Sequence, residues 1–268
     1  MSLPLPAERD ESMASTPPPL PLPPDDGARA PAWLTGATTG AGLLAGAAAW
    51  SVGEAVLAAF PPPLTRTVVM GMEIFRPTFQ DQSAADYRNG TMAFAALGGL
   101  LGLAMGIAGG LARRSVRAGL RAGAIGLVLG AALGAAASLA LIAAYLRAAD
   151  RSPEELSRDL FLPLAVHGGI WAACGLAGGA ALGMGLGGPR GRVLQAAVGG
   201  LIGAAAGAVL YELIGASAFP ADRTASPVSA TRATRLMARL LVAGLAGLVA
   251  ALVVNLPTAR EDAAADRG

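Results

Sequence analysis

Six long apolar stretches alternate with short polar segments along the chain. They cover residues 33–60, 92–112, 121–146, 160–187, 193–218 and 236–256. Runs of about 20 apolar residues match a hydrocarbon core roughly 30 Å thick when they are helical. Backbone groups in lipid must be hydrogen-bonded within their own segment, and these runs are too long and uniform for barrel strands. The pattern therefore predicts an all-α polytopic transmembrane bundle of about six spans, within a membrane domain covering residues 32–257.

Glycine recurs at every fourth position inside several of these stretches. An α-helix brings every fourth residue to nearly the same face, so each series forms a groove without side chains, along which a second helix can approach to backbone contact. We therefore predict close-packed helices. The predicted helix-packing residues are Gly102, Gly106, Gly110, Gly126, Gly130, Gly134, Gly175, Gly179, Gly183, Gly199, Gly203 and Gly207.

The second half of this series repeats the first. Gly102 and Gly175 are 73 residues apart, as are Gly126 and Gly199. A duplicated helical hairpin in spans two to five explains the match, and so does a shared bias toward glycine, because two glycine-rich segments match at several positions by chance. The sequence favours the duplication without excluding the bias.

Composition supports a membrane protein and excludes several kinds of site. The chain is 54% hydrophobic and 14% charged, with a formal net charge of +2. All 20 basic residues are arginine, which excludes a phosphate-binding Walker lysine or a Schiff-base lysine, and indicates a GC-rich, bacterial genome. No basic stripe suits a nucleic acid. With one cysteine, Cys174, and one histidine, His167, neither a cysteine metal cluster nor an HExxH zinc site is present in the sequence.

The two ends of the chain are polar. Residues 1–31 contain nine prolines and scattered acids, so we expect a disordered tail, with a PxxP ligand as an alternative use. This tail lacks the basic start of a cleavable signal peptide, and we expect the first span to be retained. Residues 258–268 form a polar C-terminal tail.

Arginine placement predicts the orientation in the membrane. The connection 113–121 contains four arginines and the connection 188–192 contains two, and neither contains an acid. By the positive-inside rule these turns face the cytoplasm of a plasma (inner) membrane, and both termini lie with them. Arg232, Arg235 and Arg239 at the start of the last span oppose this assignment. On the outer side, the apolar piece 68–75 is too short to span and predicts an interfacial helix or a part-inserted loop.

Three ionisable residues lie inside the predicted spans, away from the arginine-flanked ends: Glu54, His167 and Glu212. Each is about six residues from the outer end of its span, so all three share a depth of roughly 9 Å, and Tyr211 adjoins Glu212. Such groups suit a proton or a cation, because histidine titrates near neutrality and a poorly solvated glutamate is pushed towards it. The alternative is polar contact between helices without further function.

These observations favour a non-enzymatic membrane scaffold or assembly component, with the lipid bilayer and a homo-oligomer formed through the glycine grooves as its partners. The rival is a small proton- or cation-linked transporter or channel that uses Glu54, His167, Glu212 and Tyr211. A membrane enzyme is a more distant third. No catalytic residue, metal ligand or cofactor is predicted.

Overall fold

The computed structural model describes residues 33–70, 72–151, 161–219 and 228–256. Both predicted tails, residues 1–31 and 258–268, lie outside the described residues. Six helices in the described part are long and apolar enough to cross a membrane. They are α1 (Trp33–Ala59), α2 (Phe79–Ala112), α3 (Val116–Arg151), α5 (Phe161–Leu186), α6 (Arg190–Ala218) and α7 (Arg232–Val254). The six predicted spans are confirmed as helices.

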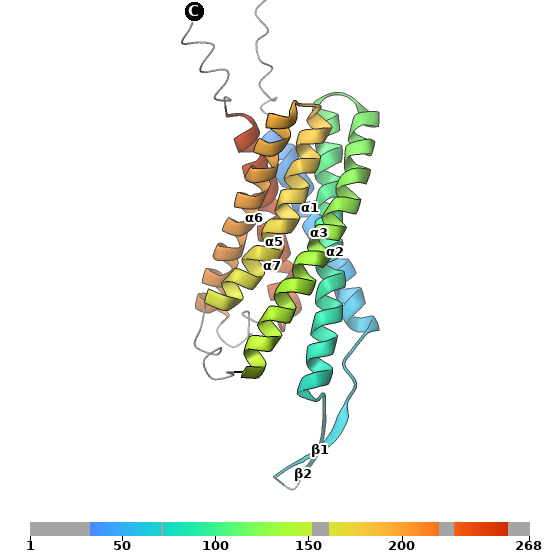
Figure 1. The fold of residues 1–268 in the computed structure, drawn as a ribbon, viewed down its shortest axis with the longest axis vertical. Coiled ribbons are helices and arrows are strands. Elements are labelled where there is room, and N and C mark those ends of the chain that lie inside the picture. Colours follow the sequence, from blue (N-terminus) through green and yellow to red (C-terminus); the bar gives the residue numbers. More distant parts are fainter. Residues whose placement is uncertain (1–32, 71, 152–160, 220–227, 257–268) are drawn as a thin grey trace, which may run out of the picture.

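The helices run up and down along one long axis (Figure 1). The short turns α2–α3 and α5–α6 lie at one end, here named the turn end, where α1 also begins and α7 finishes. A β-ribbon projects from the opposite end, here named the ribbon end. Around the bundle, α1 packs between α2 and α7, α6 packs between α5 and α7, and α2 contacts α5. Helix α3 covers α2 and α5 from outside.

Tight turns close the two hairpins at the turn end. Two residues beyond the end of α2, Arg114 lies in the left-handed region (φ 58°), and the Ser115 amide donates to the Gly110 carbonyl at 2.8 Å. Gly187 ends α5 with φ 67°, a conformation that costs glycine nothing because it has no Cβ. Turns this short force the joined helices to be antiparallel neighbours.

The predicted glycines lie at helix contacts. A Cβ added at Gly106 of α2 would come 2.6 Å from the Ala122 carbonyl carbon of α3, and one at Gly203 of α6 would come 2.9 Å from Ala246 Cα of α7. The four glycine series differ in the neighbouring helix that they contact. Those on α2 and α3 face each other and the series on α5 faces α6, whereas Gly199, Gly203 and Gly207 face α7.

Helix α2 begins thirteen residues before the apolar stretch that starts at position 92. Thr78 is its N-cap, and the Asp81 amide donates to the Thr78 hydroxyl at 3.1 Å. Hydropathy marks only the part of a helix that can lie in lipid, so this polar first segment was not predicted. The Thr78-x-x-Asp81 spacing, which resembles a capping box, was the local signal for it.

Residues 68–70 and 72–75 belong to a two-stranded ribbon, so the predicted interfacial helix is wrong, whereas part-insertion of this loop into the membrane stays a prediction. Strands β1 (Thr65–Val69) and β2 (Met72–Arg76) are antiparallel, with Arg66 opposite Phe75 and Val68 opposite Glu73. Both strands are rich in β-branched or aromatic residues, which suit a pleated strand, and the segment is too short for a stable isolated helix. Met70 at the turn has φ 52°.

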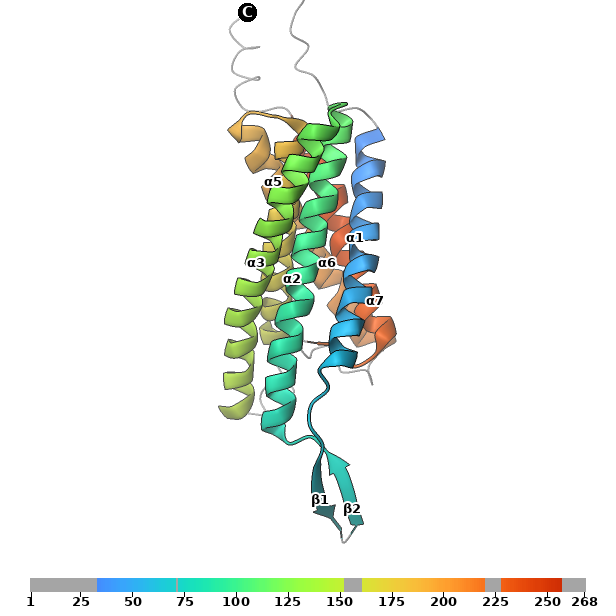
Figure 2. The ribbon, with the colours of Figure 1, turned by 90° about the vertical axis from the view of Figure 1, so that its right-hand side faces the viewer.

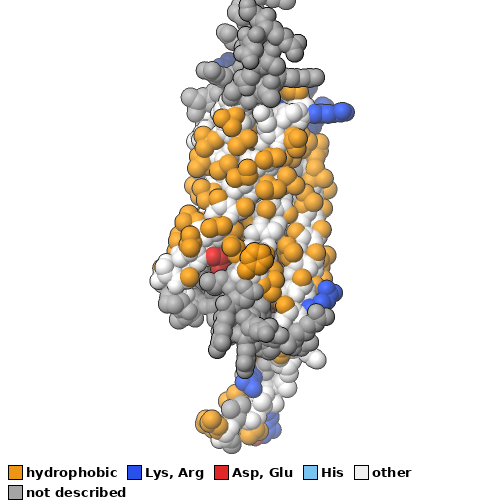
Figure 3. Space-filling view, turned by 60° about the vertical axis from the view of Figure 1, so that its left-hand side comes forward, with side chains coloured by type: hydrophobic (Ala, Val, Ile, Leu, Met, Phe, Trp, Pro, Cys, Tyr) orange, Lys and Arg blue, Asp and Glu red, His pale blue; other side chains and the backbone are white. Residues whose placement is uncertain are grey.

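The outer surface of the bundle is apolar along its length. Large hydrophobic side chains are exposed on several helices, among them Leu44, Val128, Leu194 and Leu213. Figure 3 shows one such face, with hydrophobic side chains covering the bundle and blue arginine side chains towards its two ends. This distribution matches helices that face lipid around their middle.

Candidate polar cavity at the ribbon end

An ion pair joins the last turns of α1 to the first turn of α7. Arg235 donates to both carboxylate oxygens of Glu54, from Nε at 2.6 Å and from Nη2 at 2.9 Å. Both side chains are 16% exposed. Arg232, which is largely exposed, reaches the same carboxylate at 3.3 Å. A two-pronged contact of this kind fixes the orientation of both groups as well as their separation.

Arg235 also fastens the segment before α7. Its Nη1 donates to the carbonyl oxygens of Ser229 at 2.7 Å and Ala230 at 2.9 Å. Thr231 caps the helix by accepting from the Thr234 amide at 3.3 Å. Most N–H groups of the Arg235 guanidinium are therefore used in holding Glu54 and this segment.

One turn further along α7, Arg239 is buried between helices. It is 8% exposed, its Nη1 donates to the Ala93 carbonyl of α2 at 2.9 Å, and its guanidinium lies 5.8 Å from the centre of the Phe94 ring. Gly53 of α1 makes room for it, because a Cβ there would come 3.1 Å from Arg239 Nη2. Among the described residues, no carboxylate lies within 4 Å of Arg239.

A second ion pair joins α5 to α6. His167 Nδ1 and Glu212 Oε1 are 2.5 Å apart, and His167 is 2% exposed. The imidazole stacks on Trp171 with ring centres 4.9 Å apart and 5° between planes. Tyr211, fully buried, meets Trp171 edge-on, and its hydroxyl is hydrogen-bonded to the Ser229 hydroxyl. The aromatic rings thus fix the histidine in one orientation.

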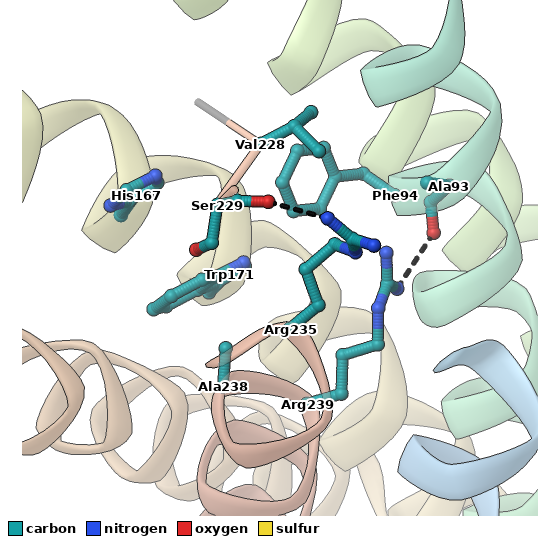
Figure 4. Close-up of a pocket in the computed structure, with 9 residues that line it drawn as sticks. All are labelled: Ala93, Phe94, His167, Trp171, Val228, Ser229, Arg235, Ala238 and Arg239. Carbon is teal, nitrogen blue, oxygen red and sulfur yellow. Dashed lines mark hydrogen bonds between the residues drawn. The ribbon is translucent and has the colours of Figure 1, made fainter. Parts of the chain in front are cut away.

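The two ion pairs flank a small cavity of about 30 Å³ (Figure 4). Arg235 and Arg239 extend side by side from α7 toward α2, whereas His167 and Trp171 lie on the α5 side. That volume accommodates about two water molecules or one small ion. Its lining residues are Ala93, Phe94, His167, Trp171, Val228, Ser229, Arg235, Ala238 and Arg239.

The structure brings the predicted site residues to one end of the bundle, as two separate ion pairs. Glu212, His167 and Tyr211 lie together, and Glu54 is bound to Arg235 across the cavity. Only His167 of the predicted residues lines the cavity. Within the described residues, no three histidine, cysteine, aspartate or glutamate side chains are arranged to hold a metal ion.

Sequence reasoning missed the arginines, which bring most of the charge to this site. Arg232, Arg235 and Arg239 are spaced as one face of a helix, and that spacing was the available signal. It was used only as evidence on membrane orientation. Trp171 and Ser229 were missed as well, because an aromatic residue in an apolar run and a serine in a loop give no local sign of a site.

The arrangement suits a proton or an anion better than a cation. Among the residues that the structure describes, three arginines and two glutamates form the cluster, so guanidinium groups outnumber carboxylates there. A histidine hydrogen-bonded to a carboxylate can share or pass a proton. The two cavity-lining guanidiniums, Arg235 and Arg239, repel a cation.

No protein-family model, curated protein or solved structure matches this chain. The function is therefore argued from the residues of the molecule itself.

Proposed function

We propose that this integral membrane protein is a non-enzymatic scaffold or assembly component: a close-packed bundle that presents the β1–β2 ribbon to another protein. The observation that carries this proposal is the exposure of apolar side chains on the ribbon. Val68, Met72 and Phe75 are each more than 60% exposed, and the ribbon extends beyond the helix ends (Figure 2). A lone two-stranded hairpin is marginally stable in water, so a partner that covers these side chains would stabilise it.

Close packing of the bundle agrees with the scaffold role. Glycines bring neighbouring backbones into contact in α2, α3, α5, α6 and α7. In lipid, where no hydrophobic effect draws helices together, such contacts hold a bundle through van der Waals packing. A densely packed interior resists deformation, which is the property required of a body that positions an interaction element.

An internal duplication of the hairpins is part of the proposal. Gly106 faces Gly123 across α2 and α3, and Gly179 faces Ala196 across α5 and α6. Each member of the second pair follows its counterpart by 73 residues. In this interpretation α6 of the second copy packs on one additional helix, α7, through Gly199, Gly203 and Gly207.

A homo-oligomer would use a different groove from the predicted one. The twelve predicted glycines all contact helices of their own chain. Gly36 and Gly40 of α1, also four residues apart, have nothing within 4 Å of an added Cβ. We assign any docking of a second copy in the membrane to this open face of α1.

Orientation follows the arginines of the turn end. Arg113, Arg114, Arg117, Arg190 and Arg192 lie there. Because its two short turns carry arginine without any acid, we propose that the turn end and both termini face the cytoplasm of a plasma membrane, with the ribbon end on the opposite side.

The test of the scaffold role is the size of the complex in gently solubilised native membranes. Val68→Asp and Phe75→Asp should each shift the protein from a larger complex to its own mass on native gels. Leu213→Asn on α6 is the control, since it is equally exposed but lies on the bundle. Migration at the protein's own mass before any substitution would contradict the role.

The second candidate is a small proton- or cation-linked transporter or channel, and the His167–Glu212 pair beside the cavity favours the proton over a cation. Flux into reconstituted vesicles tests it. Native flux that is lost in both Glu54→Gln and Glu212→Gln would favour transport over the scaffold role, and absence of flux would remove this candidate.

A further inference from the structure

We infer that the cavity between α2, α5 and α7 binds a small monovalent inorganic anion of about the size of chloride, with Arg239 as its main ligand. The inference is independent of the scaffold role, because binding is measured on the isolated protein and assembly is measured in membranes. It follows from charge balance, from donor geometry and from the size and walls of the cavity.

The charge balance of the described residues favours an anion beside Arg239. The Glu54 carboxylate is shared by Arg235 and Arg232, and the Glu212 carboxylate is bound to His167. That leaves Arg239, 8% exposed, with no carboxylate of the described residues within 4 Å. A guanidinium stays protonated in proteins, and a buried charge without a partner is costly. An anion beside Arg239 would remove that cost.

Donor geometry points to the same place. The five N–H groups of Arg239 meet one protein acceptor, the Ala93 carbonyl. The guanidinium lines the cavity next to that of Arg235, with both groups on its α2 side (Figure 4). Two adjacent guanidiniums that together meet one carboxylate form an anion-binding arrangement. Arg235 is occupied by Glu54 and by backbone carbonyls, and therefore adds mainly its field.

The size and walls of the cavity select the kind of anion. A volume of about 30 Å³ admits a halide-sized ion. Phe94, Trp171 and Ala238 form apolar walls, which favour a weakly hydrated single charge over a strongly hydrated double charge. The Ser229 hydroxyl is the neutral polar group on the opposite side.

The experiment is thermal unfolding of the purified full chain in lipid-free, non-ionic detergent, with chloride replacing gluconate at constant ionic strength. Gluconate is a larger and more strongly hydrated anion than chloride. Chloride should raise the melting temperature by about 3 °C at roughly ten times its dissociation constant, and the shift should grow with the logarithm of concentration beyond that. A separate arm adds an anionic phospholipid in gluconate, because a lipid phosphate could meet the same guanidinium.

Three variants assign the effect to the cavity. Arg239→Gln should lose the chloride shift and should not melt lower than the unchanged protein in gluconate, since it removes an unpaired buried charge. Arg117→Gln, at an exposed arginine of the turn end, should keep the shift. Glu54→Gln enlarges the positive excess, so its melting temperature should begin to rise at a lower chloride concentration, which a merely structural role of Glu54 does not predict.

The inference is overturned by an absence of any chloride shift, by a full shift in Arg239→Gln, or by stabilisation from anionic lipid alone. If Arg239→Gln cannot be purified, Glu54→Gln decides. An onset of the shift at a lower chloride concentration then supports the anion site, and an unchanged onset overturns it.

Discussion

The two ends of this bundle are held together by different forces. Towards the turn end, glycines of α2, α3, α5 and α6 place one helix backbone against another. Towards the ribbon end, the space between helices is filled by large polar and aromatic side chains. Every aromatic residue of the chain except Trp33 lies in the half of its helix nearer the ribbon end, or beyond the helices.

The difference shows how one glycine-rich bundle combines close packing with buried charge. Helices that touch through glycine leave no room for a guanidinium or an imidazole. At the ribbon end, the rings of Phe94 and Trp171 line a cavity together with charged side chains. Substitutions at the two ends should therefore fail for different reasons.

The largest effect is expected at the turn end. Gly106→Leu would place side-chain atoms inside the backbone of Ala122 and Gly123, and the helices would have to separate. Overpacking against backbone costs about 3 kcal/mol or more, enough to remove much of the folded protein. Size-exclusion chromatography and thermal unfolding in detergent would measure it. Gly191→Leu, where nothing lies within 4 Å of an added Cβ, is the control, and an equal loss there would refute backbone contact as the cause.

A smaller loss is expected from breaking the ion pair at the ribbon end. Glu54→Gln leaves Arg235 without its carboxylate, and because both groups are 16% exposed we expect about 2 kcal/mol, less than for a fully buried pair. A double-mutant cycle with Arg235→Gln measures the coupling directly, since the double variant should lose less than the sum of the single variants. Additive losses would show that the contact contributes nothing specific.

Gly53→Ala is a milder change, and it tests the boundary between the glycine-packed region and the charged region. Gly53 contacts the mobile end of a side chain, Arg239 Nη2, and not a backbone. Gly53→Ala should therefore cost only about 1 kcal/mol, because the guanidinium can shift by a few tenths of an ångström. The cost should fall when Arg239 is also changed to Gln. A penalty as large as that of Gly106→Leu would place Gly53 with the backbone-packed region.

The smallest effect is expected outside the bundle. Arg66 and Glu73 form an ion pair on the ribbon, and both side chains are more than half exposed. Arg66→Ala should change the free energy of unfolding by less than about 0.5 kcal/mol, because water and salt screen such pairs. A loss comparable to that of Glu54→Gln would show that ion pairs at the two sites do not differ.

Much of the fold could be predicted from the sequence. Continuous apolar runs identify six spans, and fourfold spacing identifies the glycines, because lipid and helix geometry impose both patterns locally. The common depth of Glu54, His167 and Glu212 follows from counting along each span. The ribbon and the polar start of α2 did not follow, since hydropathy reports the membrane boundary and not the end of a helix.

The local sequence pattern could not predict which charged residues pair with each other at the site. Glu54 and Arg235 are 181 residues apart, and they meet because α1 packs on α7. His167 and Glu212 pair because α5 packs on α6. One sequence gives the depth of each residue in the membrane but not the order of helices around the bundle, and that order decides which charges meet.

The polar first segment of α2 also adds to the length of the molecule along its long axis. Thirteen residues of helix before the apolar stretch add about 20 Å at 1.5 Å per residue. A hydrocarbon core is roughly 30 Å thick. Helix α2 is therefore longer than the core by a large part of the core's thickness. With the apolar stretch of α2 in the hydrocarbon core, the ribbon before its polar start would lie beyond the lipid headgroups, which is the placement that the proposed scaffold role requires.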